Sequence, residues 1–192
     1  MRATQSVEFV TSATAPAHYP KALAHEFVFV GRSNVGKSSL LNALFFNQKL
    51  AKVSATPGKT RLINFFQWEN CLFADVPGYG FARGPKAERR TWKAMMADYF
   101  STRRPLELVF LLVDARHAIS PLDLDMEAYL IEAAIPYVLI LTKWDALSQS
   151  ERSARLREYT DTCGAHPPIA FSAKTRVGVR ELWKVIHDHC AA

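Results

Sequence analysis

The eight residues from Gly31 to Ser38 match the phosphate-binding pattern G-x-x-x-x-G-K-[ST] at every fixed position. They directly follow the apolar run Phe27–Val30, which is typical of a buried strand. In such a strand–loop–helix unit, successive backbone N–H groups surround an anion and the helix N-terminus adds a positive dipole end. Lys37 would then reach the outer phosphates of a nucleotide, and the Ser38 hydroxyl would bind Mg²⁺.

A second motif ends the apolar strand expected over residues 71–75, where Asp75-Val76-Pro77-Gly78 has the form Asp-x-x-Gly. Asp75 would hold Mg²⁺ through water, and the Gly78 N–H can bond a γ-phosphate only when one is present. Because loss of that phosphate would release the loop, the motif predicts a switch. Alone it is weak, since strand-terminal turns often have this form, but its position after the phosphate loop makes it informative.

A third motif, Thr142-Lys143-Trp144-Asp145, follows the apolar strand from Pro136 to Leu141 and matches the guanine pattern [NT]-K-x-D. The carboxylate of Asp145 can accept hydrogen bonds from guanine N1–H and from the 2-amino group, and adenine has neither donor at those places. Lys143 would lie along the base and tether the phosphate loop, while Thr142 would tie the base loop to its neighbours. This motif favours GTP over ATP.

A fourth motif, Ser172-Ala173-Lys174, follows the strand that includes Phe171 and offers the Ala173 N–H to guanine O6. It has little weight alone, but four motifs in the correct order, each at a strand end, predict a GTP site. Two other classes stay open. An ATPase or small-molecule kinase is disfavoured by Asp145 and by the Thr142-Lys143 pair. A nonhydrolysing RNA-binding scaffold with a degenerate site is disfavoured by intact Lys37, Ser38, Thr60 and Asp75. Only turnover data separate that scaffold from an enzyme.

Strand and helix patterns alternate along the chain, which is typical of a parallel sheet with helices on both faces. Two strands meet across Glu69-Asn70, a tight hairpin, so one strand should run antiparallel. We predict a three-layer α/β P-loop G domain with a mostly parallel six-stranded sheet, one antiparallel strand and a possible short N-terminal strand. The expected strands cover 7–11, 26–31, 61–68, 71–75, 107–114, 136–142 and 167–171, and the expected helices 37–47, 87–102, 121–134, 149–163 and 177–190.

The 192 residues, 49% of them hydrophobic, fit one compact domain. We expect residues 1–22 to form an N-terminal segment packed on a main domain of residues 23–192.

The sequence shows neither a membrane-length apolar run nor a signal-peptide core, so a cytoplasmic location is expected. The three cysteines lack metal-site spacing and are expected to be reduced packing residues. His187 and His189 are two apart on a helix and point to different sides, which argues against a metal pair.

The formal charge is +6 and the pI is near 9.3, which suits a polyanionic partner such as RNA or an ordinary solvated basic surface. The segment from Gly84 to Arg104 combines helical apolar spacing at Trp92, Met96 and Tyr99 with outward basic positions. It predicts an RNA-facing surface, with a solvated helix face as the alternative. The basic residues of this surface are Lys86, Arg89, Arg90, Lys93, Arg103 and Arg104.

From about Glu26 to the C-terminus the chain resembles the EngB family of bacterial GTPases, also called YihA or YsxC. The resemblance rests on residues 31–42, on Thr-Pro-Gly-Lys-Thr at 56–60 with Ile-Asn-Phe-Phe at 63–66, and on Asp-Val-Pro-Gly-Tyr-Gly-Phe-Ala at 75–82. It implies a monomeric GTP/GDP-binding and Mg²⁺-dependent switch that assists assembly of the large ribosomal subunit. The resemblance also implies a need for the protein in normal cell division and septation.

The resemblance further implies that Thr60 completes the Mg²⁺ shell, with Gly58 and Lys59 near the nucleotide. Arg61 stands where members usually carry Gln, and Trp144 stands where a small residue is common, so Trp144 could alter the rim of the base pocket. The metal ligands expected are Ser38, Thr60 and Asp75, and the catalytic residues expected are Lys37, Thr60 and Gly78. The nucleotide-binding residues expected are Gly31, Arg32, Ser33, Asn34, Val35, Gly36, Lys37, Ser38, Ser39, Gly58, Lys59, Thr60, Arg61, Leu62, Asp75, Val76, Pro77, Gly78, Thr142, Lys143, Trp144, Asp145, Phe171, Ser172, Ala173 and Lys174.

Tyr79 occupies the position where many small GTPases place the Gln that orients the attacking water. A phenol lacks the paired acceptor and donor of an amide, so intrinsic hydrolysis should be slow. A partner could supply the missing group, since an inserted arginine contributes about 10³–10⁵-fold in related systems. Asn34 offers a second route, because an Asn at this loop position coordinates K⁺ in potassium-stimulated relatives. Asp114, which also ends an apolar strand, is expected to close a turn with Arg116 and not to act in catalysis.

Overall fold

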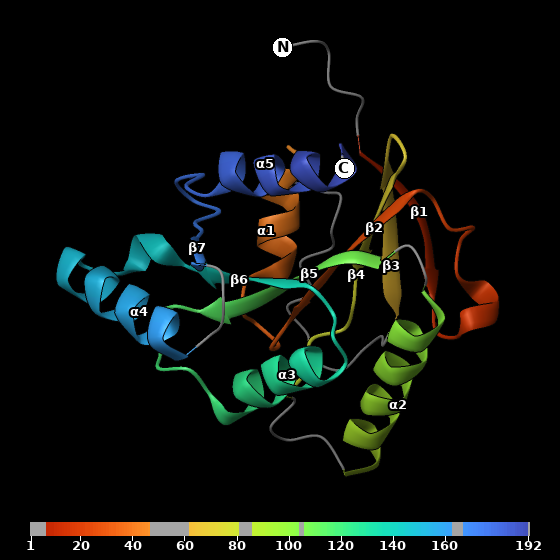
Figure 1. Ribbon diagram of the computed structural model, residues 1–192, viewed down its shortest axis with the longest axis horizontal. Coiled ribbons are helices and arrows are strands. Elements are labelled where there is room, and N and C mark those ends of the chain that lie inside the picture. Colours follow the sequence, from red (N-terminus) through yellow and green to blue (C-terminus); the bar gives the residue numbers. More distant parts are fainter. Residues whose placement is uncertain (1–6, 47–61, 81–85, 104–105, 163–166, 192) are drawn as a thin grey trace.

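Seven strands form a single sheet in the order β1-β3-β4-β2-β5-β6-β7 (Figure 1). The computed structural model describes residues 7–46, 62–80, 86–103, 106–162 and 167–191. The predicted N-terminal strand is therefore present, and it lies at one edge of the sheet. The strands are β1 (Glu8–Ala13), β2 (His25–Gly31), β3 (Ile63–Trp68), β4 (Cys71–Asp75), β5 (Leu106–Asp114), β6 (Tyr137–Thr142) and β7 (Ile169–Ala170).

Strand β3 is antiparallel to both of its neighbours, β1 and β4, whereas β4, β2, β5, β6 and β7 pair in parallel. The turn between β3 and β4 consists of Glu69 and Asn70, and Glu69 has a φ of 51°. Two-residue hairpin turns favour such positive φ values because they match the twist of the paired strands. The predicted hairpin and the predicted single antiparallel strand are confirmed.

Helices cover both faces of the sheet (Figure 1). Phe27 and Phe29 of β2 pack in one apolar layer with α1 and α5, and Val28 and Val30 pack in the other with α2, α3 and α4. Because side chains alternate along a strand, the uninterrupted apolar run of β2 fills both layers. The helices are α1 (Lys37–Leu44), α2 (Lys86–Thr102), α3 (Pro121–Glu132), α4 (Gln149–Thr162) and α5 (Val179–Cys190).

The boundaries differ from the predictions mainly at element ends. Helix α1 stops at Leu44, three residues early, and the following Phe46 has a left-handed φ of 53°. Strand β7 has only two residues, shorter than the predicted 167–171. Helix α5 begins after Gly178, whose φ of 85° ends the preceding loop. Such ends depend on local backbone geometry, which apolar periodicity does not report.

Helix α2 turns Met96 and Tyr99 into the core, as its apolar spacing predicted. Arg103, in contrast, was expected on the outward basic surface, and this expectation is wrong. Its guanidinium pairs with the fully buried carboxylate of Glu26 in β2, which also accepts a hydrogen bond from the Tyr99 hydroxyl. A buried carboxylate needs such partners because desolvation disfavours an unpaired charge. The pair therefore anchors the C-terminal end of α2 to the sheet.

No helix in the described ranges is both long and apolar enough to cross a membrane.

Candidate functional site

Four neighbouring strands deliver polar or glycine residues to the same edge of the sheet. Strands β4, β2, β5 and β6 lie side by side in parallel and end at Asp75, Gly31, Asp114 and Thr142. The carboxyl edge of an open α/β sheet is where ligands bind in such folds. The motifs predicted from sequence therefore meet at one place, although they are spread over more than a hundred residues of chain.

The phosphate loop connects the end of β2 to the start of α1. Asn34 and Gly36 have left-handed φ values of 66° and 104°, while the side chain of Val35 is buried in the core. The helix begins at Lys37 directly after Gly36, and the Leu40 N–H donates to the Gly36 carbonyl at 2.9 Å. A loop with alternate left-handed residues ahead of a helix N-terminus can bind an anion through its backbone N–H groups.

Lys37 at the start of α1 forms an ion pair with Asp75 at the end of β4, and both side chains are largely buried. Ser38 follows Lys37 in the first turn of the helix. A hydroxyl and a carboxylate are the oxygen donors that Mg²⁺ accepts together with phosphates and water. Within the described ranges no group of three or more His, Cys, Asp or Glu side chains could hold a metal. Ser38 and Asp75 supply oxygen donors of this kind.

The Asp-x-x-Gly loop runs directly against the phosphate loop. The Ser33 N–H donates to the Tyr79 carbonyl at 2.9 Å, and the Tyr79 N–H donates to the Gly31 carbonyl at 3.2 Å. A β-carbon on Gly78 would lie 2.9 Å from the Ser33 nitrogen, so only glycine permits this approach. The Gly78 backbone thus lies directly beside the phosphate loop.

The Tyr79 side chain is buried in the core. Its hydroxyl donates to Asp123 of α3 at 2.8 Å, and its ring meets Trp92 of α2 edge-on at 5.7 Å. Burial, and next the negative charge of Asp123, raise the pKa of Tyr79 well above its usual range. Trp92 in turn donates its Nε1–H to the Pro77 carbonyl at 2.8 Å. The loop is therefore tied to both α2 and α3.

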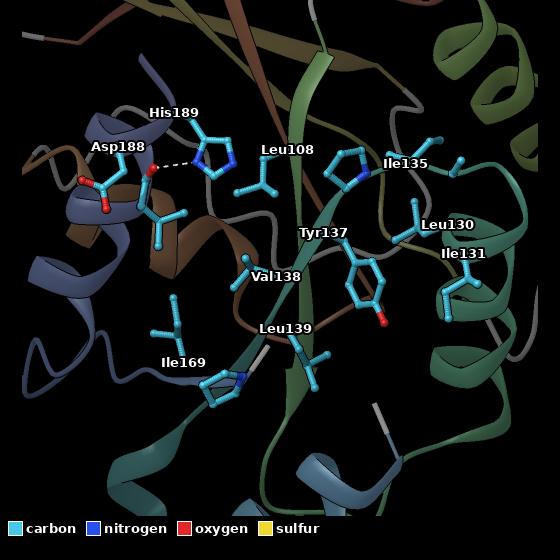
Figure 2. A pocket seen from close by; sticks show the side chains of 14 residues that line it. Leu108, Leu130, Ile131, Ile135, Tyr137, Val138, Leu139, Ile169, Asp188 and His189 are labelled. Atoms are coloured by element: carbon cyan, nitrogen blue, oxygen red, sulfur yellow. Dashed lines mark hydrogen bonds between the residues drawn. The ribbon is translucent and has the colours of Figure 1, made fainter. Parts of the chain in front are cut away.

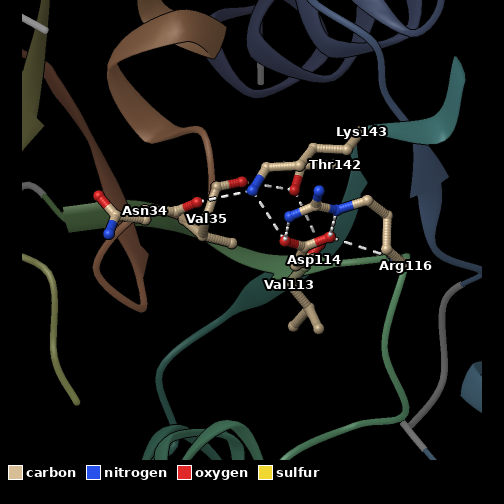
Figure 3. Close-up of polar contacts among 7 residues, drawn as sticks. All are labelled: Asn34, Val35, Val113, Asp114, Arg116, Thr142 and Lys143. Atoms are coloured by element: carbon tan, nitrogen blue, oxygen red, sulfur yellow. Dashed lines mark hydrogen bonds and ion pairs between the residues drawn. The ribbon is translucent and has the colours of Figure 1, made fainter. Parts of the chain in front are cut away.

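The third motif holds the phosphate loop from the side of β6 (Figure 3). The Thr142 hydroxyl lies 2.7 Å from the Val35 carbonyl and 3.0 Å from the Val113 carbonyl. The Lys143 ammonium donates to the Asn34 carbonyl at 2.7 Å. Two successive residues of the base motif thus contact two successive residues of the phosphate loop, as the sequence predicted for their tethering roles.

Asp114, which sequence reasoning assigned only to a turn with Arg116, also orients Lys143 (Figure 3). Its carboxylate pairs with Arg116 at 2.8 Å, as predicted, and with the Lys143 ammonium at 2.8 Å. Burial alone would raise the pKa of Asp114, but the hydrogen bonds from Arg116 and Lys143 outweigh it and hold the pKa well below its usual range. Asp114 lies directly opposite Thr142 in the β5–β6 register, a pairing that the sequence alone does not report.

Asp145 is oriented by the fourth motif. The buried Ser172 hydroxyl donates to Asp145 Oδ1 at 2.6 Å and accepts a bond from the Thr175 N–H at 3.1 Å. The Trp144 side chain is buried in the core, and its effect on the rim of the base pocket stays a prediction. Phe171 is also buried, and its backbone carbonyl accepts the Trp144 N–H at 3.1 Å.

The Asp-x-x-Gly loop and the third motif both contact the phosphate loop directly. The fourth motif is attached to the third through the hydrogen bond from Ser172 to Asp145. Four predicted residues of the first switch, Gly58, Lys59, Thr60 and Arg61, lie outside the described residues, and Leu62 begins the next described segment. Lys37, Ser38 and Ser39 lie in the first turn of α1, and the other predicted residues lie at strand ends or in the adjoining loops.

A groove of about 650 Å³ lies elsewhere, at the amino ends of β5 and β6 (Figure 2). Apolar side chains such as Leu108, Ile135, Val138 and Ile169 line it, with His189 of α5 at one side. Because the motifs lie at the opposite edge of the sheet, this groove is not part of the candidate nucleotide site.

Comparison with known sequences agrees with this geometry. A family model described as "50S ribosome-binding GTPase" matches residues 26–143. The "Probable GTP-binding protein EngB" of Kosmotoga olearia is 45% identical over 186 residues, which cover 95% of this chain and 97% of that protein. The protein of the same name from Thermotoga maritima is 46% identical over 186 residues, covering 95% of both chains.

Solved structures show the same fold. The crystal structure of a probable GTP-binding protein engB has a TM-score of 0.72 and 25% identity, covering 85% of this chain and 97% of that one. Era, in complex with MgGDPNP and nucleotides 1506–1542 of 16S ribosomal RNA, has a TM-score of 0.67 and 22% identity, covering 88% of this chain and 57% of that one. The second likeness concerns the fold alone.

Proposed function

The chain belongs to the EngB family of GTP-binding proteins and is a GTPase, and we propose that it is a slow, Mg²⁺-dependent switch that assists assembly of the large ribosomal subunit. In this proposal the GTP-bound form engages a precursor particle in the cytoplasm and hydrolysis releases it. A role in normal cell division and septation would follow from a supply of ribosomes that limits growth.

The observation that carries the nucleotide assignment is the tie between the base loop and the phosphate loop. Lys143 and Thr142 hold the carbonyls of Asn34 and Val35, so the two halves of a nucleotide site have a fixed spacing. Ser172 orients the Asp145 carboxylate, which can accept the two donors on the guanine edge. Calorimetry with GTP, GDP and ATP in Mg²⁺ tests the proposal. We expect binding of both guanine nucleotides and at least 100-fold weaker binding of ATP, since adenine leaves the Asp145 carboxylate unpaired.

This calorimetry, together with an assay of phosphate release from GTP, separates the proposal from its two rivals. An ATPase or small-molecule kinase would bind ATP as well as GTP, or better. A scaffold with a degenerate site would bind no nucleotide, or would bind GTP and release no phosphate over many hours. Either result would contradict the proposal that the protein is a GTP-dependent switch.

The residues proposed to bind phosphate differ from those proposed to hold the metal. Lys37 would contact the β- and γ-phosphates, and the Gly78 N–H would bond the γ-phosphate. Ser38, Asp75 and Thr60 would hold Mg²⁺, with Asp75 acting through water. The metal supplies charge neutralisation on the phosphate oxygens as the bond to the γ-phosphate breaks. Lys37 and Asp75 already lie in contact, which supports a shared site for metal and phosphate.

Slow intrinsic turnover is supported by the direction of the Tyr79 side chain. Its hydroxyl is engaged with Asp123 and its ring with Trp92, so the hydroxyl is occupied and does not orient a water. Acceleration must then come from a group that the partner or a cation supplies.

We predict that K⁺ raises GTP turnover relative to Na⁺ through Asn34. The Asn34 backbone is held by Lys143, and its side chain points away from the Lys143 ammonium, which leaves the amide oxygen available (Figure 3). Phosphate release measured in matched KCl and NaCl should differ several-fold in the native protein. The Asn34→Ala variant should lose this difference while it retains GDP affinity. Equal turnover of the native protein in both salts would contradict the role of Asn34.

We predict that Asp114→Asn weakens binding of GTP and GDP about three- to tenfold. The change keeps the size of the side chain but removes the charge that orients Lys143, which would lie along the base. Arg116→Ala is the matched control, since it removes the other cation on Asp114 and leaves Lys143 in place. Calorimetry on both variants should show the loss only in the first. Equal losses would mean that Asp114 merely closes its turn.

The ribosomal partner is supported by the family description, "50S ribosome-binding GTPase", and by the basic positions on α2. Era offers a parallel, since it has this fold and its crystal structure contains ribosomal RNA. In this chain Arg90 and Lys93 are exposed on α2, one turn apart, and Trp92 ties that helix to the loop that would sense GTP. A partner bound on α2 is therefore coupled to the nucleotide site.

We predict that the double reversal Arg90→Glu/Lys93→Glu weakens binding to large ribosomal subunits and lowers its salt dependence. Each lost phosphate contact should reduce the slope of log affinity against log salt by about one. The control is Arg180→Glu/Lys184→Glu on α5, which makes the same charge change on the opposite face of the sheet. Sedimentation with isolated subunits and a nonhydrolysable GTP analogue measures both. Intact binding by the α2 variant would contradict an RNA-facing α2.

We also propose that residues 1–22 are a segment packed on a G domain of residues 23–192. The pairing of β1 with β3 supports this proposal, because it places the segment at the edge of the main sheet.

A further inference from the structure

The sulfur atoms of Cys71 and Cys190 lie 2.8 Å apart, although 119 residues separate them in the chain. Both residues are free thiols in this structure, and neither belongs to the nucleotide site. A disulfide bond is about 2.05 Å long, so a shift of less than about 1 Å joins the two atoms. We propose that Cys71 and Cys190 are a covalent modification site, a dithiol that a small oxidant converts to an intramolecular disulfide.

The packing of α5 holds the two thiols together. Cys71 begins β4 and Cys190 ends α5, and both belong to the apolar layer between the sheet and this helix. Leu182 and Ile186 bury the helix face, and Trp183 donates its Nε1–H to the Leu44 carbonyl at 3.0 Å. Because the sheet and the helix are anchored independently of the cysteines, their packing holds the two sulfur atoms in contact before any bond forms.

The two thiols differ in solvent exposure, which indicates which one reacts first with the oxidant. Cys71 is buried, whereas Cys190 is partly exposed at the end of its helix. The Cys190 thiolate attacks one sulfur of a small disulfide, whose other half leaves as a thiolate and takes up a proton. The Cys71 thiolate then attacks Sγ of Cys190 and expels the second half. Two protein thiols lose two electrons and two protons, and one small disulfide becomes two small thiols.

The surrounding charges select the kind of oxidant and set a slow rate. Burial raises the pKa of both thiols, and the nearby carboxylates of Glu69 and Glu107 raise them further. His25, which is opposite Cys71 in the β2–β4 register, pairs with Glu107 at 2.9 Å. Few thiolates are therefore present at neutral pH, and anionic oxidants are repelled. A neutral reagent such as bis(2-hydroxyethyl) disulfide should react faster than an anionic one.

The test uses the purified full chain, which has three cysteines. After treatment with bis(2-hydroxyethyl) disulfide, the Cys163→Ser variant should have no remaining thiol, with a monomer on a nonreducing gel and a mass two daltons lower. Peptide mapping should join residues 71 and 190. A rise in Tm of roughly 10 °C should accompany the bond and disappear on reduction, because the closed loop restricts the unfolded chain.

Two variants keep the test decisive. Cys163→Ser should form the same bond, and Cys190→Ser should form none and show no rise in Tm. Three unreacted thiols in the native protein, a bond to Cys163, or a bond that fails to raise Tm would overturn the proposal.

Discussion

Asp145→Asn should weaken binding of GTP and GDP by about 100- to 1,000-fold and should favour xanthine nucleotides. The native carboxylate accepts from two donors on the guanine edge, and each charge-assisted hydrogen bond contributes about 1.5–3 kcal/mol. An Asn side chain has one acceptor and one donor, so its amide group would face the 2-amino group of guanine, donor against donor. Xanthine has a carbonyl at that position and can accept from the amide. Calorimetry with GDP and with the diphosphate of xanthosine measures both effects.

The control for this change is Ser172→Ala, which leaves the carboxylate in place and removes only the hydroxyl that orients it at 2.6 Å. We expect about a tenfold loss of affinity there, with no gain for xanthine, since the Asp145 carboxylate still accepts from guanine. If Asp145→Asn bound GDP as the native protein does, then the base assignment and the role of this loop would both be wrong.

Gly178→Ala should be the most destabilising single methyl added to the described part of the chain. Gly178 has a φ of 85°, and a β-carbon there would lie 2.3 Å from the Ala170 carbonyl oxygen, an atom of the β7 backbone. The left-handed conformation costs an L-residue about 1–2 kcal/mol, and the backbone clash forces α5 and β7 apart. We expect a total loss of about 3–5 kcal/mol in unfolding free energy and a fall in Tm of about 10 °C or more.

Gly80→Ala is the matched control for strain without a backbone clash. Its φ is 76°, but the nearest atom to an added β-carbon is the Leu122 Cδ1 at 3.0 Å, the end of a flexible side chain. Thermal unfolding should show a loss of only about 1–2 kcal/mol in this variant. Equal losses in the two variants would mean that backbone strain, and not the contact with β7, decides the cost.

The Gly178 variant should also weaken guanine binding in the protein that stays folded. The Ser172 N–H donates to the Val177 carbonyl at 3.1 Å, and Ser172 orients Asp145. A displaced 177–178 segment therefore disturbs the base loop, although no atom of Gly178 is expected to contact the nucleotide.

Most of the fold could be predicted from the sequence because its signals are local. The buried run Phe27–Val30, the turn at Glu69-Asn70 and the spacing of Met96 and Tyr99 each report their element directly, since apolar periodicity follows the geometry of strand or helix. The nucleotide motifs are equally local, because each uses backbone groups or side chains of consecutive residues. Family membership and the G-domain fold are therefore confirmed, and the GTPase activity with them.

Pairings between distant residues could not be predicted in this way. The order of four motifs and the alternation of elements follow from the sequence alone, and the preference of Asp145 for guanine is predicted from it. Only the tertiary structure showed that Asp114 orients Lys143, that Arg103 is buried against Glu26, that Trp144 points into the core and that Cys71 meets Cys190. The reason is that a residue type specifies which bonds a side chain can make, whereas the packing of the sheet and its helices decides which partner comes within reach.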